Sequence, residues 1–257
     1  MKIVGNLLDG KKILVMGAAN RRSIAWGCAS VMQEQGAELI YTYQNERLKK
    51  SLLKLVGDEN LLVECDVSDD ESLTNAFSTI KERFGKIDGI VHAIAFAPKN
   101  ELEGDILNST RAGFAQALDV SSFSFLAVAK SALEQDLLAE KASLATLTFM
   151  GSSRAIPSYN TMGVAKAALE AEMRYMARDL GKRGIRVNAI SAGAVKTLAV
   201  TGIKGHSKLL DMSQDRAVDD VSVTTTQIGG MCAFLMSDLA SGVVGDVIYV
   251  DKGVHLI

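Results

Sequence analysis

The chain has 257 residues, 48% of them hydrophobic, which is enough apolar material for one large core. Its formal net charge is −2 and its 28 lysines and arginines are scattered, so the basic patch of a nucleic-acid-binding protein is missing. Cys28, Cys65 and Cys232 are far apart and lack metal-ligand spacing, so they indicate reduced thiols rather than a metal site or a disulfide framework.

The N-terminal segment has neither the long apolar region nor the cleavage site of a signal peptide. No apolar stretch of the sequence reaches the length that a membrane-crossing helix needs. We therefore expect a soluble, cytoplasmic protein that has no membrane span and binds no metal.

Short apolar runs alternate with longer segments of helical periodicity, a pattern typical of a parallel sheet covered by helices on both faces. The predicted strands span residues 11–17, 37–43, 60–67, 87–95, 143–150, 185–192 and 245–251. The predicted helices lie near residues 23–35, 45–56, 70–84, 111–140, 158–181 and 226–236. The sequence therefore predicts an α/β fold with seven mainly parallel strands, as a single domain over residues 1–257.

Two predicted helices begin with the spacing of a capping box, Ser68 with Glu71 and Thr224 with Gln227. One long segment, residues 193–225, has little regular periodicity. A connection of that length inside a compact domain usually has a function, so we expect it to be a substrate lid.

The first predicted strand runs into the turn "GAANRRSIAWG", which contains Gly17 and leads into a helix at Ser23. A small-residue turn followed by a helix N-terminus suits a diphosphate, although the stretch lacks GxGxxG and alone would equally fit an ordinary tight turn. Asp66 and Val67 after the third strand, and "VHAIAFAP" around the fourth, end at the same edge of the sheet. We therefore expect a dinucleotide crevice at that edge.

The end of the second strand bears on which dinucleotide is bound. An NAD site usually has an acidic residue there for the ribose hydroxyls, whereas this chain has Gln44. Gln44 can hydrogen bond neutral hydroxyls, and Arg21, Arg22, Arg47 and Lys49 could instead meet a 2′-phosphate. We expect NADH, with NADPH as the alternative.

Tyr159 and Lys166 are seven residues apart in a predicted helix, so they share one face with a separation of about 10 Å along the axis. The lysine side chain leans toward the tyrosine without reaching a close hydrogen bond. A nicotinamide ribose would fit between them, and the ammonium is expected to lower the pKa of the phenol. Alternatively, the pair is a core edge and a solvent-reaching lysine.

Motifs in order along nearly the whole chain carry a family resemblance: "GAANRRSIAWG", "TYQNERLKK", "ECDV", "HAIAFAP", "RAIPSYNTMGVAKAALEAEMRYMA" and "RVNAISAGAVKTLAVTGI". With these motifs the chain resembles the enoyl-acyl-carrier-protein reductases, a divergent branch of the short-chain dehydrogenase/reductase superfamily. Its Tyr-x6-Lys spacing, followed by "SAG" and "TLA", is specific to that branch, since ordinary superfamily members use Tyr-x3-Lys.

The resemblance implies a Rossmann-type, doubly wound sheet and reduction of trans-2-enoyl thioesters on acyl carrier protein during fatty acid biosynthesis. By similarity, Tyr159 donates to the thioester oxygen, Lys166 anchors the nicotinamide ribose, Ala97 contacts substrate, and residues 196–215 form a substrate-binding loop. The positions that match cofactor-binding residues are Gly17, Ser23, Ile24, Gln44, Asp66, Val67, Ile94, Lys166, Val195, Lys196, Thr197, Leu198 and Ala199.

The chain departs from the family pattern at two positions. Phe149 stands where a second active-site tyrosine is usual, and Ala194 stands where a proline is usual. Phenylalanine cannot donate a proton, so these departures leave catalytic efficiency and substrate preference open. The alternatives are a reductase of another enone or carbonyl substrate, and a nucleotide-sensing protein without turnover.

Two kinds of partner follow from the resemblance. Acyl carrier protein is acidic, so Lys204, Lys208 and Arg216 near the expected lid are candidates for docking it. The resemblance also implies a homotetramer with contacts through the predicted helices 111–140 and 158–181.

Overall fold

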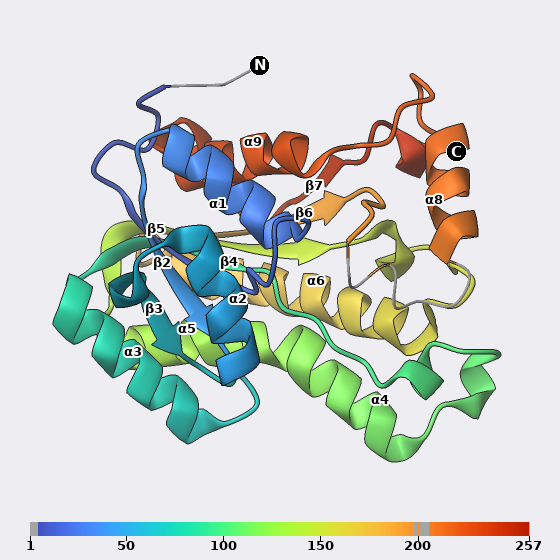
Figure 1. Cartoon of the computed structure of the whole chain (residues 1–257), viewed down its shortest axis with the longest axis horizontal. Helices are drawn as coiled ribbons and strands as arrows, with labels where there is room; N and C mark the ends of the chain where they lie inside the picture. The colour runs from blue at the N-terminus through green and yellow to red at the C-terminus, as the bar shows by residue number, and fades with distance from the viewer. Residues whose placement is uncertain (1–4, 198–199, 201–205, 257) are drawn as a thin grey trace.

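The computed structural model describes residues 5–197, 200 and 206–256 (Figure 1). Seven strands form one sheet in the order β3-β2-β1-β4-β5-β6-β7, and each neighbouring pair is parallel. The strands are β1 Lys12–Met16, β2 Glu38–Tyr43, β3 Leu62–Glu64, β4 Ile87–His92, β5 Leu138–Thr148, β6 Arg186–Ala192 and β7 Val247–Val250. The predicted seven-stranded, doubly wound Rossmann-type architecture is confirmed.

Helices cover both faces of the sheet, as Figure 1 shows. The main helices are α1 Ile24–Glu34, α2 Glu46–Val56, α3 Asp70–Phe84, α4 Arg111–Leu118, α5 Ser124–Glu134, α6 Asn160–Gly181, α8 His206–Asp215 and α9 Thr225–Met236. The apolar run of β1 follows from its burial on both faces. Leu14 and Met16 pack with α3, α5 and α6, while Ile13 and Val15 pack with α1 and α9. A strand buried on both faces shows no alternation of polar and apolar residues.

Helices α1 and α9 approach each other at two glycines. A β-carbon on Gly229 would lie 2.5 Å from the Gly27 carbonyl oxygen, and one on Gly27 would lie 2.5 Å from the Thr225 side chain. Any larger residue at either position would therefore push the helices apart. This contact also fixes the beginning of α1, which starts immediately after Ser23.

The caps differ from the prediction at one of two sites. The Thr224–Gln227 capping box is present, with both reciprocal hydrogen bonds. The Ser68–Glu71 prediction is wrong, because Asp69 caps α3 by accepting from the Glu71 and Ser72 amides. Asp69 can bond the first free amides with a shorter reach, and Ser68 instead donates its hydroxyl to Asp66 at 2.7 Å.

The helix predicted at 111–140 is interrupted and ends earlier. A π-helical turn, Asp119–Phe123, joins α4 to α5, and the chain enters β5 at Leu138 rather than at residue 143. The run Arg111–Glu134 spans 24 residues, and its most apolar stretch has a mean hydropathy of 1.3, so by length and composition it could cross a membrane, contrary to expectation. Half of its most apolar stretch is buried inside the fold, as expected for a helix that covers a sheet.

Two further predictions need correction. Helix α6 begins at Asn160, so Tyr159 precedes its first turn. The segment 193–225, predicted to be irregular, contains α8. This helix has only two adjacent leucines and one methionine as large apolar residues, too few to show a helical period in the sequence.

Candidate active site

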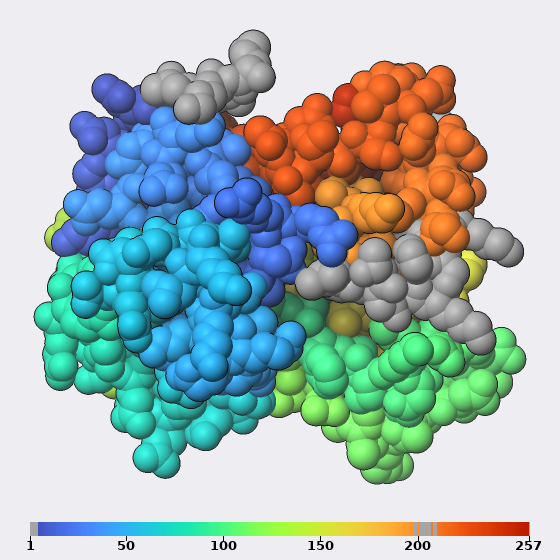
Figure 2. Space-filling model, in the orientation of Figure 1, coloured from blue at the N-terminus to red at the C-terminus, as the bar shows by residue number. Residues whose placement is uncertain are grey.

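A cleft of about 810 Å³ opens at the carboxyl ends of the four central strands. The residues that directly follow β1, β4, β5 and β6 all line it, namely Gly17, Ala93, Phe149 and Gly193. The chain order reverses between β1 and β4, which is the position where open α/β sheets bind ligands. Figure 2 shows the surface hollowed between the blue N-terminal segments and the green segment of α4.

The first turn is shaped for a close-lying diphosphate. Gly17 has φ +94, and a β-carbon there would lie 2.1 Å from the Ala93 carbonyl oxygen, so only glycine fits. Ser23 caps α1 by accepting from the Trp26 amide at 3.2 Å. Of the described residues, none accepts a hydrogen bond from the Ile24 or Ala25 amide. These amides and the helix dipole can therefore bind an anion.

The ends of β2 and β3 are joined by side chains. Gln44 Nε2 donates to Asp66 Oδ2 at 3.0 Å, and Asp66 Oδ1 accepts from the Ser68 amide and hydroxyl. Although burial of the carboxyl acts in the opposite direction, the hydrogen bonds from Ser68 and Gln44 lower the pKa of Asp66. An ionised Asp66 and the Gln44 amide thus form a polar wall of the cleft beyond the ends of β2 and β3.

The four cations that could select a 2′-phosphate are placed differently. Arg47 lines the cleft. Lys49 pairs with Glu59 at 2.6 Å and lies over the Tyr43 ring. Arg21 and Arg22 are exposed and do not line the cleft.

Tyr159 and Lys166 both line the cleft, although Tyr159 is the N-cap residue of α6 and not part of its helical face, contrary to the prediction. Lys166 is buried, and its Nζ donates to the Leu147 carbonyl oxygen at 2.8 Å. Burial lowers the pKa of Lys166 to about 8, while the charges of Glu170 and Glu172 act in the opposite direction. Lys166 therefore loses its proton at a lower pH than an exposed lysine does.

The expected lowering of the tyrosine pKa is wrong in this geometry. Burial raises the pKa of Tyr159, and the charge of Glu170 raises it further. The ammonium of Lys166 cannot compensate, because it is directed to Leu147 and forms no hydrogen bond with the phenol within the described residues. Tyr159 is thus a neutral hydrogen-bond donor. The ring of Phe149 packs edge-on against it.

Most of the predicted site residues meet in this cleft. The predicted residues that line it are Gly17, Ser23, Ile24, Gln44, Asp66, Val67, Ile94, Phe149, Tyr159, Lys166, Val195 and Thr197. Lys196 is exposed and is not among the lining residues, and Leu198 and Ala199 lie outside the described residues. Ala97 does not line the cleft either, whereas its neighbour Phe96 does.

Phe96 shows what sequence reasoning missed. Its amide donates to Ser121 Oγ at 2.8 Å, and the same hydroxyl donates back to its carbonyl oxygen at 2.8 Å. Ser121 belongs to the π-helical turn, which also supplies Val120 to the cleft. No spacing in the sequence indicated that this turn folds beside the fourth strand.

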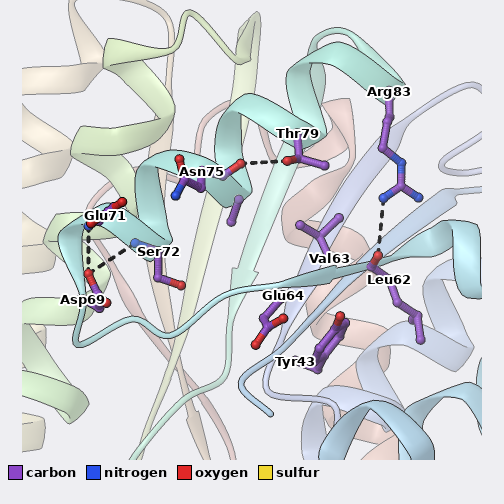
Figure 3. A pocket seen from close by; sticks show the side chains of 11 residues that line it. Tyr43, Leu62, Val63, Glu64, Asp69, Glu71, Ser72, Asn75, Thr79 and Arg83 are labelled. Atoms are coloured by element: carbon purple, nitrogen blue, oxygen red, sulfur yellow. Dashed lines mark hydrogen bonds between the residues drawn. The ribbon is translucent and has the colours of Figure 1, made fainter. Parts of the chain in front are cut away.

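A second hollow of about 510 Å³ lies at the free edge of the sheet, between β3 and α3 (Figure 3). Glu64, Asp69 and Glu71 are among the residues that line it, while Arg83 donates to the Leu62 carbonyl oxygen at 3.4 Å. None of the predicted site residues lines this hollow. The predicted site residues that line a common hollow are therefore those of the central cleft. Among the described residues no group of three histidine, cysteine or acidic side chains is arranged to hold a metal ion.

Residues 17–255 match the family described as Enoyl-(Acyl carrier protein) reductase. The chain belongs to this family. It is 57% identical over 249 residues to an enoyl-acyl-carrier-protein reductase (NADH) of Enterococcus faecalis, covering 97% of this chain and 99% of that protein. A corresponding Bacillus subtilis enzyme is 45% identical over 253 residues, with 97% of each chain covered.

Solved structures of family members have the same fold. The Bacillus cereus enoyl-acyl carrier protein reductase, crystallised with NADP+ and indole naphthyridinone, superimposes with a TM-score of 0.94 at 45% identity and 98% coverage of both chains. The NADH enzyme of Aquifex aeolicus also gives a TM-score of 0.94, at 40% identity and 98% coverage of both chains. The family resemblance stated from the motifs is confirmed.

Proposed function

We infer that this protein is an NADH-dependent enoyl-acyl-carrier-protein reductase, which saturates trans-2-enoyl thioesters in the elongation cycle of fatty acid biosynthesis. The observation that carries this inference is the presence of Tyr159 and Lys166 in one dinucleotide-sized cleft of a chain 57% identical to such an enzyme. The glycine turn at Gly17 and the free amides at the start of α1 fit the diphosphate of the cofactor.

We propose the following division of roles among the residues. When bound, NADH supplies a hydride to the β-carbon of the enoyl thioester. Tyr159 donates a hydrogen bond to the thioester oxygen, where negative charge develops during the reaction. Lys166 binds the nicotinamide ribose, and Gln44 with Asp66 holds the adenosine end. Phe149 closes the cleft beside Tyr159 and takes no part in proton transfer.

The cofactor-binding proposal also includes the segment after β6. Val195 and Thr197 line the cleft and would lie along the nicotinamide, continuing through Lys196, Leu198 and Ala199. Residues 196–215 would form the substrate-binding loop, and Ala97 with Phe96 would contact the acyl chain. Burial of the acyl chain by this loop would exclude water from the reacting atoms.

Phe149 favours one alternative function. Because the usual second tyrosine is missing, the cleft could have been remodelled for another enone or a carbonyl substrate. NADPH also remains an alternative, since Gln44 carries no charge that would repel a 2′-phosphate and Arg47 lines the cleft.

Oxidation of NADH and of NADPH should be followed with trans-2-enoyl thioesters of several chain lengths, with simple ketones and with enones. We expect turnover of the thioesters with NADH and none of the ketones. Turnover of ketones or enones alone would favour the alternative reductase. Cofactor binding without oxidation across the whole panel would favour a nucleotide sensor.

Docking of acyl carrier protein is proposed for Lys204, Lys208 and Arg216. Lys204 and the side chain of Lys208 lie outside the described residues, while Arg216 follows α8 and is half-buried. Their reversal to glutamate should raise KM for carrier-bound substrate and leave KM for a small thioester unchanged. Equal changes for both substrates would argue against docking at this surface.

We further propose a cytoplasmic homotetramer. Exposed apolar side chains along α4 to α6 support such an assembly, with Phe123 51%, Leu126 38% and Tyr175 70% exposed. Light scattering of Leu126→Asp and of Tyr175→Asp should show smaller assemblies than the wild type. A wild-type monomer at micromolar concentration would rule the tetramer out.

A further inference from the structure

The last two residues of strand β5 and Phe149, which follows them, contact helix α6 and its N-cap residue Tyr159. The Leu147 carbonyl oxygen accepts from Lys166 Nζ at 2.8 Å, Thr148 Oγ1 donates to Glu170 Oε1 at 2.6 Å, and the ring centroids of Phe149 and Tyr159 are 5.1 Å apart. Two of these three attachments hold the catalytic pair itself. The third holds Glu170, to which neither the sequence motifs nor the proposed mechanism assigns a role.

Glu170 lies one helical turn after Lys166, on the same face of α6. Its hydrogen bond to Thr148 is a short, charge-assisted one, and Thr148 is buried at the carboxyl end of β5. Glu170 and Lys166 do not form a direct ion pair, because the ammonium is directed to Leu147. The carboxylate therefore acts on the pair in two ways, through the position of β5 and through its charge.

The other titratable groups around Lys166 leave Glu170 as its main charged neighbour. His92 on β4 is fully buried between Thr146 and Ser124, and burial lowers its pKa to about 3, so it is neutral. Glu172 accepts from Ser122 Oγ at 3.1 Å, and burial raises its pKa to about 7, so its charge is incomplete near neutral pH. Asp119, Arg111 and Lys130 on the neighbouring helical segments are exposed to solvent.

The Glu170 charge acts in a known direction. It raises the pKa of both Lys166 and Tyr159, opposing the burial of the ammonium and adding to the burial of the phenol. Both effects favour the protonated forms, an ammonium to hold the ribose and a neutral phenol to donate. Removing the charge should therefore make Lys166 lose its proton at lower pH.

We propose that Glu170 is a positioning residue of the reductase, which fastens the end of β5 to α6 through Thr148 and holds the Lys166 ammonium charged beside Tyr159. This inference rests on the proposed function, in which Lys166 binds the nicotinamide ribose. Glu170 itself does not line the cleft.

The test compares Glu170→Gln with Thr148→Val. Glu170→Gln removes the charge and keeps a hydrogen-bond acceptor, whereas Thr148→Val removes the hydrogen bond and keeps the charge. For Glu170→Gln we expect the alkaline decline of kcat, and of NADH affinity measured by fluorescence without substrate, to shift to lower pH. For Thr148→Val we expect kcat to fall roughly tenfold with the alkaline decline unmoved.

Glu170→Asp keeps the charge and should restore the alkaline decline to its wild-type position while kcat stays low. Asp179→Asn is the matched control, since it removes one exposed carboxylate from the same helix. Wild-type behaviour of Glu170→Gln, or an equal shift in Asp179→Asn, would overturn the proposal. If Glu170→Gln fails to fold, Thr148→Val and Glu170→Asp test the proposal instead. Unchanged kcat in both of these variants would overturn it.

The proposed function and the positioning role of Glu170 can be disproved separately. If the wild type binds NADH but reduces no enoyl thioester, the proposed function fails. The pH dependence of NADH affinity still tests Glu170 in that case, because it requires no turnover. If thioesters are reduced and Glu170→Gln leaves both pH profiles unchanged, only the positioning role fails.

Discussion

The rings of Phe149 and Tyr159 meet edge to face, with centroids 5.1 Å apart and an interplanar angle of 69°. This contact places Phe149 where its ring edge lines the cleft beside the proposed donor. Phe149→Tyr should therefore preserve or increase kcat for enoyl thioesters, since it adds only a hydroxyl to a ring that already fits. The measurement is steady-state NADH oxidation by both forms. A severe loss would show that the cleft has been remodelled for another substrate.

Tyr159→Phe should lower kcat by about a hundredfold or more while the affinity for NADH changes little. The reason is that the phenol hydroxyl donates to the reacting oxygen, whereas the cofactor is held by Lys166 and the first turn. Kinetics and NADH fluorescence titration on the same preparation separate the two effects. Equal turnover by the variant would remove the proposed role of Tyr159.

Gly229→Ala should destabilise the protein by about 1–3 kcal/mol, because its β-carbon would lie 2.5 Å from the Gly27 carbonyl oxygen. The displaced α1 should also bind NADH more weakly, since its N-terminus carries the proposed diphosphate site. Thermal unfolding and NADH titration measure the two effects. Gly230→Ala is the control, because a β-carbon there meets nothing within 4 Å. Equal stability of both variants would contradict the close approach of α1 and α9.

Glu172→Gln should stabilise the cofactor-free protein above neutral pH. Burial raises the pKa of Glu172 from 4.5 to about 7, although Ser122 and Lys166 act in the opposite direction. Between these values the folded state binds more protons than the unfolded state, so stability falls as the pH rises through this window. Glutamine cannot ionise and loses this dependence.

The melting temperature of Glu172→Gln should therefore exceed that of the wild type at pH 8 and approach it near pH 4.5. The buried Oε1 atom, which has no hydrogen-bond partner, adds to the cost of the ionised form. Asp179→Asn provides the comparison on the exposed face of the same helix. A lower melting temperature for Glu172→Gln at pH 8 would contradict the effect of burial.

Elements with strong local signals were predictable from the sequence. Residues within a single short stretch of sequence encode each of these features, namely each of the seven strands, the cap at Thr224 and the motifs of the first turn. The strand boundaries were less predictable. Residues 138–142 belong to β5 because Leu138 pairs with a residue of β4. No local sequence pattern encodes this pairing. Helix α8 was missed for a similar reason, because its sequence has no marked apolar face.

The sequence alone determined the fold class, the family and most of the predicted residues that line the cleft, because parallel-sheet patterning and family motifs are read along the chain. The tertiary structure alone decided how those residues act on one another. The spacing of Tyr159 and Lys166 predicted a lowered phenol pKa, but burial and the charge of Glu170 raise it. A pKa depends on solvent exclusion and on charges brought near by folding, and neither can be read from the distance between two residues in the sequence.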